Sequence, residues 1–139
     1  MLELIPHRNE MLWIDEVLSS EAEGGRCQST ITSKKHYISN GQVRISAYIE
    51  LQSQAFCLSM GTYFLNNKIN KIIKNPMLVG VDELLVNENA IVIGDEVIIE
   101  VKLNRKIDNI YFVQGKIKNN RSGIVYCEAG IRLYAQVEE

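Results

Sequence analysis

One long apolar segment, from Ser46 to about Asn66, constrains the fold more than any other part of the chain. Ser46 is the expected N-cap of a helix, and Glu50, the only charged residue in the segment, falls within its first two turns. Apolar side chains occur on almost every side of this helix, which predicts that it is buried and does not lie on a surface. They are Ile49, Leu51, Ala55, Phe56, Leu58, Met60, Tyr63, Phe64 and Leu65.

The C-terminal half provides the sheet that such a helix needs. Residues 76–86, 94–107, 109–118 and 123–137 are rich in β-branched and aromatic residues, and turn signals separate them. Val97, Ile99, Val101 and Leu103 are expected to point one way, while the polar side belongs to Glu96, Glu100, Lys102 and Asn104. This pattern is typical of antiparallel strands with one face in water. Two further strands are expected at 11–19 and 25–33, with a polar loop at 34–42. The sequence predicts an α+β fold, with one helix packed on a curved antiparallel sheet.

Composition narrows the function. The chain has 139 residues, which suits a single domain over 1–139, and its net charge of −2 gives no sign of a nucleic-acid-binding surface. The apolar segment is too polar to span a membrane, because it carries Glu50, glutamines and hydroxyls. An N-terminus with a proline and charges in its first ten residues does not look like a signal peptide, so a cytoplasmic protein is expected.

The three cysteines, Cys27, Cys57 and Cys127, are widely spaced and odd in number. This pattern predicts no disulfide framework, and without a CxxC pair or clustered histidines it predicts no metal site. A reducing compartment is the expected setting, with Cys57 and Cys127 acting as small apolar residues. A cysteine nucleophile would need a nearby base, and the sequence shows none.

Four stretches, in order along the chain, resemble one family. They are IPHRNEMLWIDEV (5–17), the pair His36-Tyr37, IELQSQA (49–55) and the run from LVGVDELLV to GDEVIIEV (78–101). Together they resemble the hot-dog dehydratases, which act on 3-hydroxyacyl groups carried by acyl carrier protein. His36 and Glu50 are fourteen positions apart, the separation that this family shows between its catalytic histidine and catalytic acid. The resemblance implies a single hot-dog domain, in which a curved antiparallel sheet wraps a long central helix.

The loop before the helix departs from the family pattern. HYISNGQVRI has no proline and only Gly41, where the family has several prolines and glycines. Ile45 stands where the family places the glycine whose backbone N–H meets the substrate carbonyl. In this respect the loop is more similar to the branch associated with aryl-polyene pigment synthesis, although Arg44 replaces a proline that is usual there.

The resemblance implies a chemistry for the matching residues. His36 would be the base that removes the proton beside the thioester carbonyl, and Glu50 the acid that assists loss of the hydroxyl. Backbone N–H groups at Ile45 and Ser46 would stabilise the enolate-like oxygen, and Gln54, at the family's helix glutamine, would contact substrate. The acid would come from a partner subunit, in a homodimer, with or without assembly into a higher oligomer, or in a heterodimer with a paralogue. The resemblance implies no cofactor in this chain, because the substrate is attached to the phosphopantetheine of acyl carrier protein.

Structural interpretations remain open beside the catalytic ones. His36 could be a solvated loop residue, Glu50 could interact with the helix dipole, and Gln54 could satisfy a backbone group. Two other functions also fit the framework. The first is a non-catalytic hot-dog subunit that binds acyl chains or accompanies an active dehydratase, and the second is a hot-dog thioesterase.

Three basic residues flank the proposed site: Lys34, Lys35 and Arg44. They are candidates for docking the acidic carrier protein or the phosphate of its phosphopantetheine, with a solvated loop as the alternative.

Overall fold

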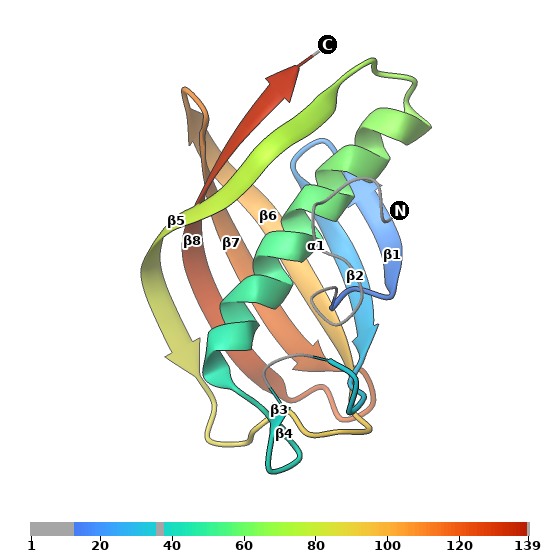
Figure 1. Ribbon diagram of the computed structural model, residues 1–139, viewed down its shortest axis with the longest axis vertical. Helices are drawn as coiled ribbons and strands as arrows, with labels where there is room; N and C mark the ends of the chain where they lie inside the picture. The colour runs from blue at the N-terminus through green and yellow to red at the C-terminus, as the bar shows by residue number, and fades with distance from the viewer. Residues whose placement is uncertain (1–12, 36–37, 139) are drawn as a thin grey trace.

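The computed structural model describes residues 13–35 and 38–138. Within them one helix, α1 (Ile45–Asn66), crosses one face of a curved, six-stranded antiparallel sheet (Figure 1). The sheet runs in the order β1-β2-β6-β7-β8-β5, and β3 and β4 form a separate small hairpin. The expected α+β arrangement is confirmed. The strands are β1 (Glu16–Glu21), β2 (Gly24–Thr30), β3 (Ile38–Ser39), β4 (Gln42–Val43), β5 (Ile72–Val86), β6 (Glu96–Ile107), β7 (Ile110–Asn119) and β8 (Val125–Glu138).

The core lies between α1 and the concave face of the sheet. Leu51 and Leu58 of the helix are completely buried, and so are Val97 and Ile99 of β6, as the alternation along that strand predicts. On β8 every second residue from Cys127 to Ala135 is buried, because these side chains point toward the helix and their neighbours point to the outside. The curved sheet therefore buries most of the apolar side chains that occur on nearly all sides of the helix.

The predicted N-cap of the helix, Ser46, is wrong by two residues. The N-cap is Arg44, whose backbone is extended (φ −71°, ψ 144°) and whose side chain makes no capping hydrogen bond. Ser46 is already inside the helix. The cause is the preceding strand, because β4 pairs with β3 up to Val43 and leaves a single residue before the helical turn.

The predicted polar loop at 34–42 is also incomplete, since it contains the β3–β4 hairpin. Its two turn residues, Asn40 (φ 55°) and Gly41 (φ 76°), both have the positive φ that a tight two-residue hairpin requires. Two-residue strands are too short to show alternation. In the described part of the chain, the strand predicted from residue 11 begins at Glu16, and Trp13 and Ile14 before it are buried in the core.

Gly24 is required by the close approach of β2 to β6. A Cβ atom added there would collide with the backbone carbonyl oxygen of Val101 and would lie 3.0 Å from the Cα atom of Lys102. Gly24→Ala should therefore lower the free energy of unfolding by about 1–3 kcal/mol, measured by urea denaturation. Gly80→Ala is the matched control, since its Cβ would meet only the flexible end of Arg132. Equal stability of the two variants would contradict the prediction.

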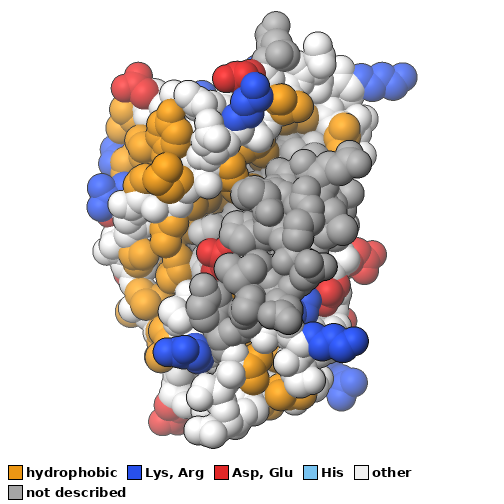
Figure 2. Space-filling model, viewed as in Figure 1, with side chains coloured by type: hydrophobic (Ala, Val, Ile, Leu, Met, Phe, Trp, Pro, Cys, Tyr) orange, Lys and Arg blue, Asp and Glu red, His pale blue; other side chains and the backbone are white. Residues whose placement is uncertain are grey.

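The two edges of the sheet differ in character. β1 is short and carries Glu16 and Glu21, whereas β5 has 15 residues and exposes a series of large apolar side chains. In Figure 2 these apolar side chains form a band along β5. Charges on a short strand discourage pairing with another chain, whereas a long apolar edge favours it. Four of these side chains lie opposite inward-facing residues of β8, and we call them the β5 row: Leu78, Val81, Leu84 and Val86.

Candidate active site

Glu50 is held by a glutamine one turn further along α1. The Gln54 side-chain nitrogen Nε2 donates to Glu50 Oε1 (3.2 Å), and Gln54 Oε1 accepts the backbone N–H of Trp13 (2.8 Å). A backbone N–H can only donate, so Trp13 fixes the orientation of the amide and leaves its NH₂ group for the carboxylate. Gln54 is only 1% exposed, whereas Glu50 is partly exposed. The helix therefore presents one oriented carboxylate at the edge of an apolar core.

The substrate contact expected for Gln54 stays a prediction. Both ends of its amide are engaged inside the protein, with Glu50 and with Trp13. Sequence spacing placed Gln54 near Glu50 but gave no hint of Trp13, which is 41 residues away. These contacts place the Gln54 amide beside Glu50 and fix its orientation.

The start of α1 is open to solvent. Ile45 is 52% exposed, Ser46 is exposed, and no acidic residue occurs in the first turn. The first N–H groups of a helix have no partner within the helix and carry its partial positive charge. At a rise of about 1.5 Å per residue, Ile45 and Glu50 are separated by about 7.5 Å along the helix axis.

A groove of about 400 Å³ opens beside this helix start, between the β3–β4 hairpin and the end of β5. We call it the hairpin groove. Most of its polar lining is neutral, and Arg44 and Glu88 are its charged residues. Tyr48, from the first turns of α1, also borders it, a residue that the sequence did not single out. Its lining residues are Ser39, Asn40, Gln42, Val43, Arg44, Ile45, Tyr48, Val86, Asn87, Glu88 and Ala90.

The proposed base lies outside the described residues, as does His7. The distance from His36 to Glu50 therefore stays a prediction. Its neighbours show where the loop runs, because Lys35 precedes it and β3 begins at Ile38. The sequence did not predict that the loop after Lys35 leads directly into the β3–β4 hairpin, which borders the hairpin groove.

The three basic candidates for docking differ in exposure. Lys34 and Arg44 are exposed. Lys35 turns inward, and its Nζ atom lies 3.1 Å from both the carbonyl oxygen of Trp13 and Oδ1 of Asp15. Because its side chain is only 11% exposed, Lys35 offers less charge to a partner than the other two.

The cysteines are unsuited to nucleophilic chemistry. Burial raises the pKa of the Cys27 and Cys127 thiols to about 11. Burial, together with the charge of Glu50, raises the pKa of Cys57 to about 12. Thiols with such pKa values are protonated at neutral pH, whereas the thiolate is the nucleophile. Among the described residues, no three His, Cys, Asp or Glu side chains are grouped so as to hold a metal ion.

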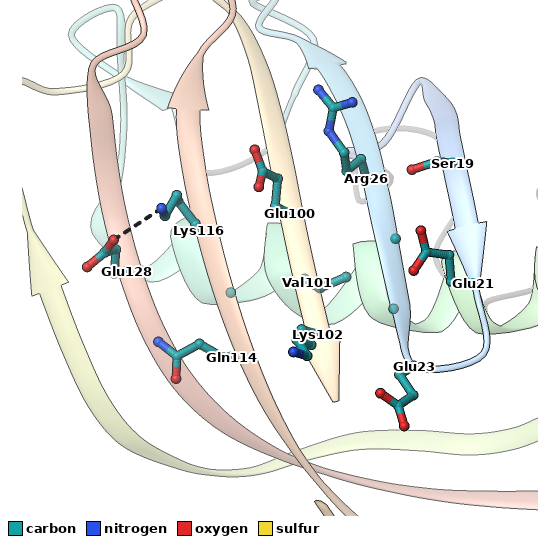
Figure 3. A pocket seen from close by; sticks show the side chains of 13 residues that line it. Ser19, Glu21, Glu23, Arg26, Glu100, Val101, Lys102, Gln114, Lys116 and Glu128 are labelled. Carbon is teal, nitrogen blue, oxygen red and sulfur yellow. Dashed lines mark ion pairs between the residues drawn. The ribbon is translucent and has the colours of Figure 1, made fainter. Parts of the chain in front are cut away.

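A larger hollow, of about 570 Å³, lies on the outer face of the sheet, opposite α1 (Figure 3). Charged side chains project from neighbouring strands there, and several are paired. Lys118 lies 2.6 Å from Glu100, whose pKa it lowers through a hydrogen bond, and Lys116 lies 3.5 Å from Glu128. Such pairs are typical of a solvated sheet face, so this hollow has no part in the candidate site.

Comparison with solved structures defines the fold family. The dehydratase heterocomplex ApeI:P from Xenorhabdus doucetiae matches with a TM-score of 0.81 and 19% identity, covering 96% of this chain and 88% of that chain. A hypothetical thioesterase with coenzyme A from Streptococcus pneumoniae TIGR4 matches with a TM-score of 0.64 and 10% identity, over 87% and 84% of the two chains. These likenesses show the fold, which is the hot-dog fold.

The family follows from the sequence. The family model for the ApeP dehydratase matches residues 1–138, and the chain belongs to this ApeP-like family. The resemblance to hot-dog dehydratases is thereby confirmed. A search of curated protein sequences finds no significant match. In the described part of the chain, α1 lacks the apolar length needed to cross a membrane.

Proposed function

We propose that the protein removes water from a 3-hydroxyacyl thioester on acyl carrier protein and gives the trans-2-enoyl thioester. The setting would be fatty-acid-like or polyene biosynthesis in the cytoplasm. The observation that carries the proposal is the Glu50 carboxylate, which Gln54 orients on an otherwise uncharged helix in a member of a dehydratase family. Elimination needs no redox cofactor, because the substrate's own thioester makes the neighbouring proton acidic.

Three groups share the reaction. His36 takes the proton beside the carbonyl, and N–H groups at the helix start, near Ile45 and Ser46, stabilise the negative charge on the carbonyl oxygen. Glu50 gives its proton to the departing hydroxyl, which leaves as water while the carbon–carbon double bond forms.

The site is completed by a second subunit, which contributes the acid. The β5 row supports this assembly, because a long apolar edge strand gains most when another strand covers it. The partner is a second copy or a paralogue. The matching ApeI:P structure is itself a heterocomplex, which favours the paralogue. Lys34 and Arg44, with a smaller share from Lys35, would receive the acidic carrier protein.

The test is direct. The purified protein is incubated with 3-hydroxyacyl carrier protein, and the carrier is followed by mass spectrometry for loss of one water. We expect the enoyl thioester to form with the protein alone or with its paralogue present. The role assignment would be wrong if His36→Ala and Glu50→Gln both retained full activity.

A second candidate is a non-catalytic subunit that accompanies an active dehydratase. It is favoured by the heterocomplex among the matching structures and by the loop before α1, which has no proline. Turnover by the purified chain in the absence of any paralogue would exclude it. The thioesterase alternative is separated in the same assay, since it would release free acid in place of enoyl thioester.

A further inference from the structure

Tyr48 links α1 to a segment far along the chain. Its ring is buried, with 1% of the residue exposed, and its phenol oxygen accepts the backbone N–H of Ile91 (3.2 Å). Ile91 is itself completely buried, and its carbonyl oxygen accepts the N–H of Val43 in β4 (2.8 Å). One chain of hydrogen bonds therefore runs from the helix through Ile91 to the β3–β4 hairpin.

The same segment, residues 91–95, also holds the other end of the loop that carries the candidate base. Ile31, at the end of β2, donates to the carbonyl of Asp95 (2.8 Å) and accepts from the N–H of Gly94 (2.9 Å). On the hairpin side, the N–H of Ile93 donates to the carbonyl of Gly41 (2.9 Å). The loop is thus attached to residues 91–95 on both sides of His36.

The hairpin itself has little intrinsic stability. β3 and β4 have two residues each and pair through Ile38–Val43 and Ser39–Gln42. Isolated two-stranded hairpins are marginal in water, so the position of this one depends on the groups that hold it. A buried phenol is well suited to this, because a tyrosine side chain has only two main torsions and its packed ring fixes where the oxygen lies.

We infer that Tyr48 is a positioning residue for the reaction proposed above. Through Ile91 it sets the distance between the start of α1, where the carbonyl oxygen is to be stabilised, and the loop that carries His36. The inference rests on the proposed function for its catalytic consequence. The structural consequence is that the Tyr48 phenol holds the hairpin in place. It depends only on hydrogen bonds between described residues.

The test is Tyr48→Phe, which keeps the ring and removes the acceptor of the Ile91 N–H. Misplacing reacting groups by about 1 Å can cost about 100-fold in rate, so we expect kcat to fall by about 10- to 100-fold with KM changed less than about threefold. Hydrogen–deuterium exchange of residues 38–43 should become at least about tenfold faster, while exchange in the middle of α1 stays unchanged. Circular dichroism confirms that the variant is folded.

Tyr111→Phe is the matched control. Tyr111 is also buried, but its ring packs on Phe56 at 5.8 Å, away from the hairpin, and both readouts should stay at the wild-type level. Unchanged exchange at 38–43 in Tyr48→Phe would overturn the inference. Faster exchange with unchanged kcat would overturn the positioning role. If the wild-type protein does not dehydrate the substrate, alone or with its paralogue, the proposed function fails, and the exchange comparison still decides whether Tyr48 holds the hairpin.

Discussion

Replacing Glu50 with glutamine should lower kcat for dehydration by about 1000-fold. Under the proposed function Glu50 gives a proton to the departing hydroxyl, and removal of a general acid of this kind costs about 100- to 10,000-fold. An amide has no proton to give at neutral pH. It keeps the size of the carboxyl group, however, and its oxygen can still accept the hydrogen bond that Gln54 now donates. The variant should therefore bind substrate with a KM close to that of the wild type.

The measurement is steady-state dehydration of 3-hydroxyacyl carrier protein, with urea denaturation alongside to show that stability is retained. Glu128→Gln is the control, since Glu128 lies on the outer face of the sheet, paired with Lys116. It should keep wild-type kcat. A Glu50→Gln variant that turned over at the wild-type rate would remove Glu50 from the mechanism.

We expect Val81→Asp to separate the subunits and thereby to abolish activity. Val81 lies in the middle of the β5 row, 42% exposed in the isolated chain. Pairing β5 with another strand would bury the new carboxylate without a partner, which is unfavourable by several kcal/mol. Because each site takes its acid from the other subunit in the proposed assembly, separated chains should lose at least about 100-fold in kcat/KM.

Light scattering after size-exclusion chromatography measures the mass, and the dehydration assay measures the activity. Leu18→Asp is the matched control, because Leu18 is also 42% exposed but lies on the β1 edge. It should leave both mass and activity unchanged. A Val81→Asp protein that kept its full mass would mean that β5 is not the interface.

The long elements could be predicted from the sequence because each shows one repeating pattern. Along β6, Val97, Ile99 and Val101 recur at every second position, and all three are buried as predicted. Ile98 departs from a strict alternation, because it is apolar and buried as well. The helix was equally clear, since an apolar stretch of that length with a single charge has few other ways to be buried. The start of the helix was not clear from the sequence. The N-cap is Arg44 because the β3–β4 hairpin ends just before it, and this outweighs the local preference for a capping hydroxyl at Ser46.

In the candidate site, only contacts between residues close together in the sequence could be predicted. Glu50 and Gln54 are four residues apart on a helix, so their contact follows from helical spacing. Tyr48 and Ile91 are 43 residues apart, and nothing in either stretch points to the other. Such a contact is set by how the sheet wraps the helix. The same holds for Lys35, which looked like a solvated loop charge and is directed inward to Asp15.

The contrast between the acidic edge at β1 and the apolar edge at β5 also governs the chain before it is assembled. With the β5 row uncovered, the single chain offers a long apolar edge to which other strands can add, and this favours aggregation. Once β5 is covered, the edge that remains repels further strands through Glu16 and Glu21. In the proposed assembly, strand pairing through β5 therefore stops at two chains.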